Sequence, residues 1–482
     1  MKPVSPGHLK HIDTFREHLL SIDKTFDCAL ELNGAEGPLA QPLTLYPGLR
    51  AGNRFAIHPM EGWDGTPNGL PSENTLRRWH RFGTSGAKLI WGGEAFAVQA
   101  DGRANPNQLF MNPDVDIERG LAELREQILE GHSAQGLQTD DLVIGLQLTH
   151  SGRFSRPDGP PKPRAAYRNP VSDRKFGIDP EVPLLTDGEL ESIGENYVRA
   201  AVLAQRAGFD FVDVKCCHSY LLHELLSART RPGTYGGSFE NRIRLFKRIL
   251  AGIRAECPGL EIGVRLSLID TPPYEANPDT RVGESMIRDE DEPYAMGFGM
   301  SARPPHDVDL EEPIRFLREL VELGITLVNV TLGSPYFCPH IQRPALYPPS
   351  DGYLPPEDPL ANVFRHISMT RRVREAVGEL TLVGTGYSYL QEWLPYVAEH
   401  EVNAGHVDFV GIGRMVLSYP EFPLHVLNNT PLERRRICRT FSDCTTAPRN
   451  GMPSGCYPLD QHYKDTADFA SLKRLKQEMR LP

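Results

Sequence analysis

Eight short segments of the chain are continuously apolar, and longer stretches with a mixed polar and apolar pattern separate them. Strands of a parallel sheet that is buried on both faces have this unbroken apolar character. Each segment is therefore predicted to be a buried strand. The segments are 55–58, 88–91, 142–148, 211–214, 262–267, 327–331, 380–384 and 409–413.

Helices are predicted between these strands. Thr186 and Glu189 form a capping box that opens one helix, and Gly208 ends it. Its apolar stripe consists of Ile193, Tyr197, Ala201 and Ala204. The next helix has Phe246, Ile249, Leu250 and Ile253 at helical spacing.

Strands that alternate with helices over residues 55–413 predict an α/β fold, a (β/α)8 TIM barrel. A doubly wound sheet is the rival fold, but no Gly-x-Gly-x-x-Gly motif follows the first strand. The predicted organisation is an N-terminal extension (1–50), the barrel (51–433) and a C-terminal appendage (434–482). The segment 272–305, after the fifth strand, has neither helical nor strand period, and a connection this long is functional or disordered.

Composition and charge narrow the classes of function. The net charge of −11 argues against a nucleic-acid partner, and no apolar window is long enough for a membrane span. The first residues lack the apolar core of a signal peptide, and the eight cysteines show no secreted framework. We expect a soluble, cytoplasmic protein that acts on a small molecule; a homo-oligomer is compatible with these features.

The most informative motif follows the fourth predicted strand. Lys215, His218 and Tyr220 come directly after it, and a loop leads to the sequence Tyr-Gly-Gly-Ser-Phe-Glu-Asn-Arg at 235–242. Barrel enzymes keep their chemistry at the C-terminal ends of the strands. Three polar side chains that can carry protons at this position predict a catalytic cluster.

This motif resembles that of the old yellow enzyme (NADH:flavin oxidoreductase) superfamily, whose members include the FMN-dependent ene-reductases. The resemblance is nearest to the barrel part of the 2,4-dienoyl-CoA reductase and trimethylamine dehydrogenase branch. It implies that FMN, reduced by NADH or NADPH, reduces the C=C bond of an α,β-unsaturated carbonyl compound. His218 would then hold the carbonyl oxygen and Tyr220 would donate the proton. Lys215 takes the place of the other carbonyl donor and departs from the family pattern.

The resemblance also assigns residues to the flavin ring, with Arg265 as the cation near N1 that stabilises the reduced ring. The assigned residues are Pro59, Met60, Glu61, Ala95, Gln147 and Arg265. For the phosphate, glycine turns follow the seventh and eighth strands, where barrels bind phosphate, and an arginine adds charge. The predicted phosphate residues are Gly384, Gly386, Gly413 and Arg414.

Two charged residues depart from the family pattern at the predicted site. Glu61 stands where relatives carry Cys or Thr beside the flavin, and Lys215 must find an anion or a cavity. Glu61 and Lys215 could neutralise each other, Lys215 could bind an anionic group of the substrate, or both could face a water-filled cleft without a role.

The loop after the sixth strand contains further polar side chains. Tyr336, His340 and Arg343 are candidates for contact with the substrate or the flavin edge. Its prolines and aromatic residues also suit plain packing.

The C-terminal appendage contains Cys438, Cys444 and Cys456, which resemble the remnant of a [4Fe–4S] module of the larger relatives. A cubane cluster needs four thiolates, and only three are present. A structural zinc site that borrows His462 is an alternative, and the absence of any metal is favoured.

Two other functions stay open at this stage. One is an FMN-dependent dehydrogenase that oxidises an amine, an alcohol or a saturated carbonyl compound, with Glu61 or Tyr220 as the base. The other is a flavin electron carrier without catalysis, which the presence of His218 and Tyr220 disfavours because a carrier needs no proton donor.

Overall fold

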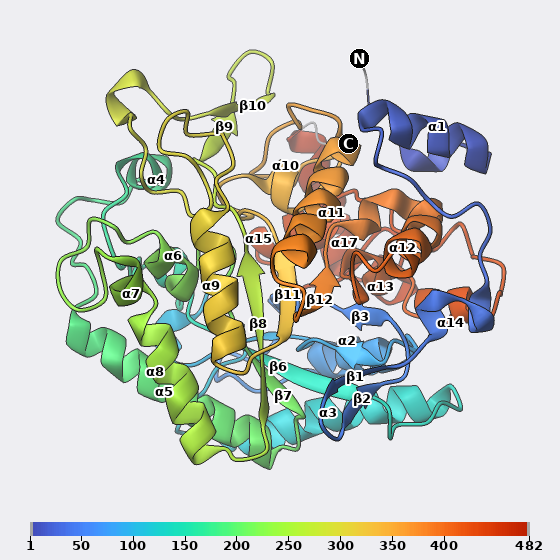
Figure 1. Ribbon diagram of the computed structural model, residues 1–482, viewed down its shortest axis with the longest axis horizontal. Coiled ribbons are helices and arrows are strands. Elements are labelled where there is room, and N and C mark those ends of the chain that lie inside the picture. The colour runs from blue at the N-terminus through green and yellow to red at the C-terminus, as the bar shows by residue number, and fades with distance from the viewer. Residues whose placement is uncertain (1–2, 480–482) are drawn as a thin grey trace.

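Eight parallel strands pair side by side and close into a barrel in the computed structural model, which describes residues 3–479 (Figure 1). The last strand pairs with the first, Val410 opposite Phe55. The strands are β3 (Phe55–Ile57), β4 (Leu89–Ile90), β6 (Val143–Thr149), β7 (Phe211–Val214), β8 (Glu261–Ser267), β11 (Leu327–Thr331), β12 (Thr381–Gly384) and β13 (Phe409–Ile412). They coincide with the eight apolar segments, so the TIM-barrel prediction is confirmed.

The second strand of the barrel is interrupted. Gly92 and Gly93 have φ of 143° and 46°, and the chain resumes extended structure in β5 (Ala95–Ala97). Both β4 and β5 pair with β6. The sequence pattern predicts only the first part, because the glycine pair breaks the apolar run.

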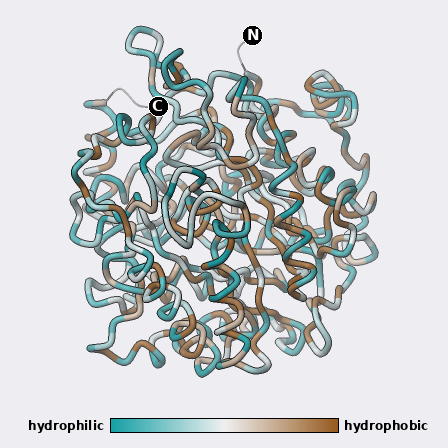
Figure 2. Tube along the Cα trace, turned by 60° about the vertical axis from the view of Figure 1, so that its left-hand side comes forward, coloured by the Kyte–Doolittle hydropathy of each residue, from teal (hydrophilic) through white to brown (hydrophobic). Residues whose placement is uncertain are grey.

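Helices surround the barrel, and the predicted capping box of α5 is present at Thr186 and Glu189. The helices are α1 (Ile12–Ile22), α2 (Glu73–Gly83), α3 (Ile117–Ala134), α4 (Pro170–Phe176), α5 (Asp187–Arg206), α6 (Leu221–Leu226), α7 (Phe239–Arg242), α8 (Arg244–Glu256), α9 (Glu311–Glu322), α10 (Pro339–Gln342), α11 (Pro359–Ala376), α12 (Leu394–Asn403), α13 (Arg414–Ser418), α14 (Phe422–Leu427), α15 (Asp443–Arg449), α16 (Gln461–Lys464) and α17 (Ala467–Glu478). Hydrophobic positions concentrate inside this ring (Figure 2). None of the helices in the described part of the chain is both long and apolar enough to cross a membrane.

An antiparallel hairpin, β1 (Leu43–Tyr46) and β2 (Leu49–Ala51), lies at the N-terminal end of the barrel strands. The Tyr46 hydroxyl accepts a hydrogen bond from the Leu327 amide at 3.3 Å and donates one to the Ile262 carbonyl at 2.8 Å. Its side chain packs with Trp91, Phe211 and Phe409 in an apolar cluster. The hairpin therefore ties strands β8 and β11 together at the end opposite to their C-termini.

Two peripheral regions complete the chain. The segment 272–305, whose sequence shows no strand period, contains a short antiparallel hairpin, β9 (Tyr274–Ala276) and β10 (Gly283–Ser285). Its strands are partly exposed, which removes the apolar period that marks a buried strand. Helices α15 to α17 have a small apolar core of their own, and Asp460 forms a two-bond ion pair with Arg77 of α2.

Candidate active site

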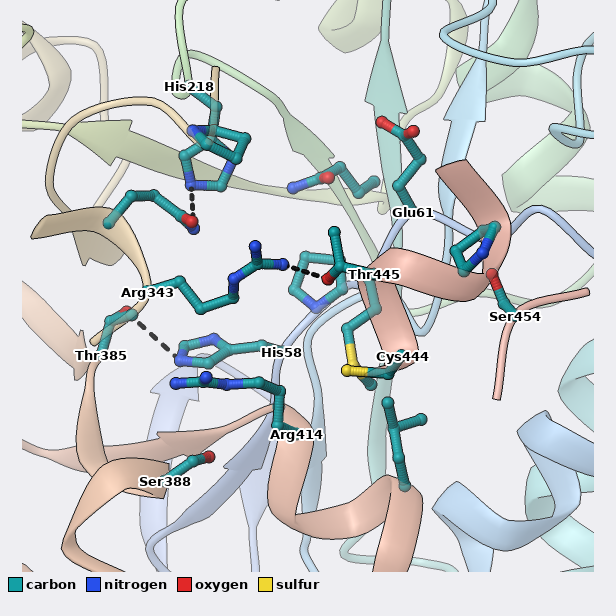
Figure 3. Close-up of a pocket in the computed structure, with 18 of the residues that line it drawn as sticks. His58, Glu61, His218, Arg343, Thr385, Ser388, Arg414, Cys444, Thr445 and Ser454 are labelled. Atoms are coloured by element: carbon teal, nitrogen blue, oxygen red, sulfur yellow. Dashed lines mark hydrogen bonds between the residues drawn. The ribbon is translucent and has the colours of Figure 1, made fainter. Parts of the chain in front are cut away.

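A cavity of about 1370 Å³, including its open mouth, lies at the C-terminal ends of the barrel strands. This is the end at which barrel enzymes place their loops and chemistry. Thirteen of the sequence-predicted site residues line it, and Figure 3 shows several of them converging on one space. They are Pro59, Met60, Glu61, Gln147, Lys215, His218, Tyr220, Arg265, Tyr336, Arg343, Gly386, Gly413 and Arg414.

Three of the predicted residues lie outside the cavity wall. Ala95 is buried, and its carbonyl accepts a hydrogen bond from the Gln108 amide at 2.7 Å. A Cβ at Gly384 would lie 3.1 Å from the Tyr387 side chain. The His340 Nδ1 lies 2.7 Å from the Tyr353 hydroxyl, and its ring faces Tyr274 of β9. The contacts expected of these three residues with the flavin or the substrate stay predictions.

His218 and Ser219 both adopt left-handed backbone conformations, with φ of 64° and 59°. A non-glycine residue pays about 1–2 kcal/mol for this conformation. The His218 amide donates to the Ser267 hydroxyl and its carbonyl accepts from Ser334, both at 3.0 Å, while the Ser219 hydroxyl donates to Asp270 at 2.7 Å. These bonds offset the strain and fix the direction of the His218 ring.

The His218 imidazole is neutral at physiological pH. Burial first, and then the nearby Arg265 and Lys215 cations, lower its pKa well below 6.5. The amide nitrogen of Gln342, a donor, lies 3.3 Å from His218 Nε2, so Nε2 accepts and the proton resides on Nδ1 (Figure 3). His218 can therefore hold a substrate oxygen as a neutral hydrogen-bond donor.

Tyr220 and Glu61 form a direct hydrogen bond in which the hydroxyl donates to the carboxylate. The other oxygen of Glu61 accepts from Trp63 Nε1 at 3.0 Å, and the Asn105 amide lies at 3.5 Å. The Tyr336 hydroxyl lies 3.2 Å from the Tyr220 hydroxyl. Burial, followed by the charge of Glu61, raises the pKa of Tyr220 well above 10, so the phenol keeps its proton.

In the part of the chain that the structure describes, Lys215 and Glu61 do not form an ion pair with each other. The Lys215 Nζ instead lies 3.8 Å from the centre of the Tyr220 ring, in a cation–π contact. Burial lowers its pKa, and the charge of Glu61 partly opposes this. Glu61 is thus engaged by Tyr220, and Lys215 remains available to a ligand.

Asp213, which sequence reasoning did not single out, organises the residues predicted for the flavin ring. Its carboxylate accepts from the Gln147 amide at 2.6 Å, from Trp91 Nε1 at 2.7 Å and from the Arg265 backbone amide at 2.7 Å. Because the Gln147 nitrogen is held in this way, its carbonyl oxygen is left to face the cavity. The sequence carries one signal for this role, a carboxylate inside the otherwise apolar strand β7.

The glycine turns after β12 and β13 form a cradle suited to a phosphate. Gly386 has φ of 100°, a conformation that favours glycine, and the nearest atom to a Cβ at Gly413 would be the sulfur of Met60, 3.8 Å away. Arg414 donates through Nη2 to the Pro344 carbonyl at 2.8 Å, and its Nη1 is buried without a partner among the described residues. A phosphate could accept from this free nitrogen.

Four cations of the cavity wall have no carboxylate within ion-pair distance in the part of the chain that the structure describes. They are Lys215, Arg265, Arg343 and Arg414. Buried cations without partners are costly, so the cavity is built for anionic ligands. The donors therefore fit FMN: Gly386, Gly413 and Arg414 would hold its phosphate, and Gln147 and Arg265 would face the polar edge of its ring.

The three cysteines of the appendage are thiols, and over residues 3–479 no group of three or more metal-ligating side chains is found. His462 lies beside α2 instead, with its Nε2 2.9 Å from the Asn74 side-chain oxygen. Cys444 lines the cavity and is drawn in Figure 3, next to Thr445.

Further cavity residues were not predicted from the sequence. His58 lies 3.1 Å from Asn329 and 3.2 Å from Thr385, and burial lowers its pKa well below 6.5. Ser388 and Arg449 also line the wall. His58 ends an apolar strand, which was a usable signal, whereas Arg449 reaches the cavity only because α15 folds back over the barrel.

Comparison with known proteins identifies the family. The model of the NADH:flavin oxidoreductase / NADH oxidase family matches residues 38–277, about half of the chain. An NADH-dependent flavin oxidoreductase from Aspergillus parasiticus is 28% identical over 50% of this chain, and the match spans 56% of that protein. An NADPH dehydrogenase from a Geobacillus species is 27% identical over 80% of this chain and 93% of its own length.

Among solved structures, 2-naphthoyl-CoA reductase superimposes with a TM-score of 0.63 over 90% of this chain, at 17% identity. The chain covers 58% of that protein, so the likeness concerns the barrel fold and not the whole enzyme. This likeness shows the fold, and the family match and the sequence relatives give the assignment. The chain belongs to the NADH:flavin oxidoreductase, or old yellow enzyme, family of FMN- and NAD(P)H-dependent oxidoreductases.

Proposed function

We propose that this protein reduces the activated C=C bond of an α,β-unsaturated carbonyl compound. The observation that carries the proposal is the arrangement of the loop after β7. A neutral imidazole donor, a lysine and a protonated phenol all face one cavity whose other donors fit FMN. FMN, when bound and reduced by NADH or NADPH, would supply the hydride that adds to the β-carbon.

The residues of the chain account for the rest of the reaction. His218 Nδ1–H and Lys215 Nζ hold the carbonyl oxygen and stabilise the negative charge that develops there. Tyr220 donates its hydroxyl proton to the α-carbon. Glu61, which accepts from Tyr220, is the group through which a proton returns to the phenol from solvent. The product has gained one hydride and one proton, so the reaction balances.

A second function is favoured by the same contact. A phenol that donates to a carboxylate can also pass its proton to it, and the pair can then act as a base. In that direction the site would oxidise an amine, an alcohol or a saturated carbonyl compound and pass the hydride to FMN.

Two anaerobic half-reactions decide between these functions. For the ene-reductase, NADH or NADPH bleaches the flavin, and an enone such as 2-cyclohexenone restores its absorbance. For the dehydrogenase, an amine or alcohol bleaches it and enones do not restore it. In the first case Tyr220→Phe slows reoxidation by the enone about 10²- to 10⁴-fold and leaves reduction by nicotinamide unchanged. Equal slowing of both half-reactions would refute the role of Tyr220.

A further inference from the structure

Two guanidinium groups, those of Arg343 and Arg449, come together at the cavity wall from segments far apart in the sequence. Arg343 follows α10, and Arg449 is the last residue of α15. Thr445 and Arg449 are four residues apart on α15 and therefore lie on one helix face. Arg343 Nη1 donates to the Thr445 hydroxyl, and Figure 3 shows this side chain reaching across the cavity.

The residues that the structure describes balance only part of the charge of this pair. Arg343 has no carboxylate partner there, and its Nη2 is buried without a hydrogen bond. Burial, and then the Arg449 and Arg414 cations, lower the pKa of Arg343 to about 10. Within residues 3–479, Arg449 pairs only with Asp351, a side chain that is 55% exposed. Like charges held together in a buried wall indicate that an anion belongs between them.

This anion is not the FMN phosphate, because the phosphate already has proposed donors in the glycine cradle and the free Nη1 of Arg414. Arg449 instead lies near Tyr336, the neighbour of the proposed proton donor Tyr220. Its guanidinium carbon is 5.8 Å from the centre of the Tyr336 ring, and the Tyr336 hydroxyl is 3.2 Å from that of Tyr220. Arg449 is thus separated from the proposed site of proton transfer by about one aromatic ring.

We propose that the Arg343–Arg449 pair is a subsite for a carboxylate on the substrate, remote from the C=C bond that is reduced. The planar fork of each guanidinium matches the two oxygens of a carboxylate. The proposal rests on the proposed function and narrows it to unsaturated carbonyl compounds that carry a carboxylate about one ring away from the reacting carbons.

Binding is tested separately from turnover. The FMN-loaded protein is titrated with 4-formylbenzoate and with its methyl ester, which have no C=C bond to reduce, and binding is followed by the change in the visible flavin spectrum. Arg449→Gln and Arg343→Gln should each weaken binding of the acid about 10- to 100-fold, the usual effect of losing a charged hydrogen bond, and leave the ester unchanged. Arg435→Gln, which removes an equal charge at an exposed position, is the matched control and should change neither.

Turnover then tests the substrate class with 4-carboxycinnamaldehyde and its methyl ester. Arg449→Gln should raise KM about 10- to 100-fold for the acid alone, with little change in kcat. Failure to reduce either aldehyde would count against the proposed function, while the titration would still report on the subsite.

Three results would overturn the subsite. In the first, binding of the acid and of the ester is weakened equally. In the second, Arg435→Gln weakens binding of the acid as much as Arg449→Gln does. In the third, Arg343→Gln loses FMN as severely as Arg414→Ala. The last result would assign the pair to the cofactor phosphate. If Arg449→Gln does not fold, Asp351→Asn offers an independent test, because it frees Arg449 and should tighten binding of the acid; weaker binding would contradict the proposal.

Discussion

Replacement of Glu61 by Gln tests the proposed proton partner of Tyr220. The change keeps the size of the side chain and its bond to the phenol, but the acceptor loses its charge. A hydrogen bond to a charged group contributes about 1.5–3 kcal/mol and a neutral one about 0.5–1.5 kcal/mol. This bond is made while the proton is still on the phenol, so the charge of Glu61 holds the proton there. Loss of the charge, a difference of about 1–2 kcal/mol, should therefore speed transfer of the proton to the α-carbon by up to about 5- to 30-fold.

The assay is stopped-flow reoxidation of the reduced flavin by an enone. Reduction by NADH or NADPH should be unaffected, because Glu61 acts only on the proton. Trp63→Phe is the matched control, since it removes the other close donor to Glu61 and leaves the Tyr220 bond in place. It should change the rate of reoxidation less than Glu61→Gln does.

A double-mutant cycle gives the decisive result. If Glu61 acts through Tyr220, the double variant Glu61→Gln with Tyr220→Phe should reoxidise no faster than Tyr220→Phe alone. Additive effects in the double variant would show that Glu61 acts independently of Tyr220, and the proposed proton path would be wrong.

Three further predictions follow from the same geometry. Arg414→Ala should raise the Kd for FMN about 10- to 100-fold by fluorescence titration without a change in the far-UV circular dichroism spectrum; unchanged affinity would refute its role at the phosphate. Lys215→Met should lower kcat for a neutral enone about 10²-fold with KM little changed, as for the loss of an oxyanion donor, and wild-type kinetics would leave the lysine without a role. Burial raises the pKa of Asp270 from 3.8 to about 7, so its folding contribution is full below pH 4 and is lost as the pH rises towards 7. Asp270→Asn should therefore raise the free energy of unfolding at pH 8 by up to about 4 kcal/mol and not at pH 4, as measured by urea denaturation.

Much of the barrel could be predicted from the sequence because its strands are buried on both faces. Segments such as 211–214 and 327–331 have no polar face and match their strands in the structure. Strand β5 and the hairpin of β9 and β10 could not be predicted in the same way. The first is separated from β4 by two glycines, and the second is too short and exposed to show a period.

The part of the candidate site whose residues come directly after a strand could be predicted from the sequence. Lys215, His218 and Tyr220 are close in sequence, so their common position in the cavity follows from the end of β7. Contacts between distant segments were not predictable. The bond between Tyr220 and Glu61, and the approach of Arg449 to the cavity, depend on how the loops and the appendage pack in three dimensions.

The hairpin of β1 and β2 has a consequence for the way this enzyme can diversify. Tyr46 links β8 and β11 at the N-terminal end of the barrel, opposite the cavity. The contacts that join the strands at this end are therefore separate from the residues that line the cavity. Loops around the cavity mouth can exchange residues, and so exchange substrates, without loss of the Tyr46 contacts. Laboratory evolution of new substrate ranges should accordingly tolerate broad changes near Tyr336 and few near Tyr46.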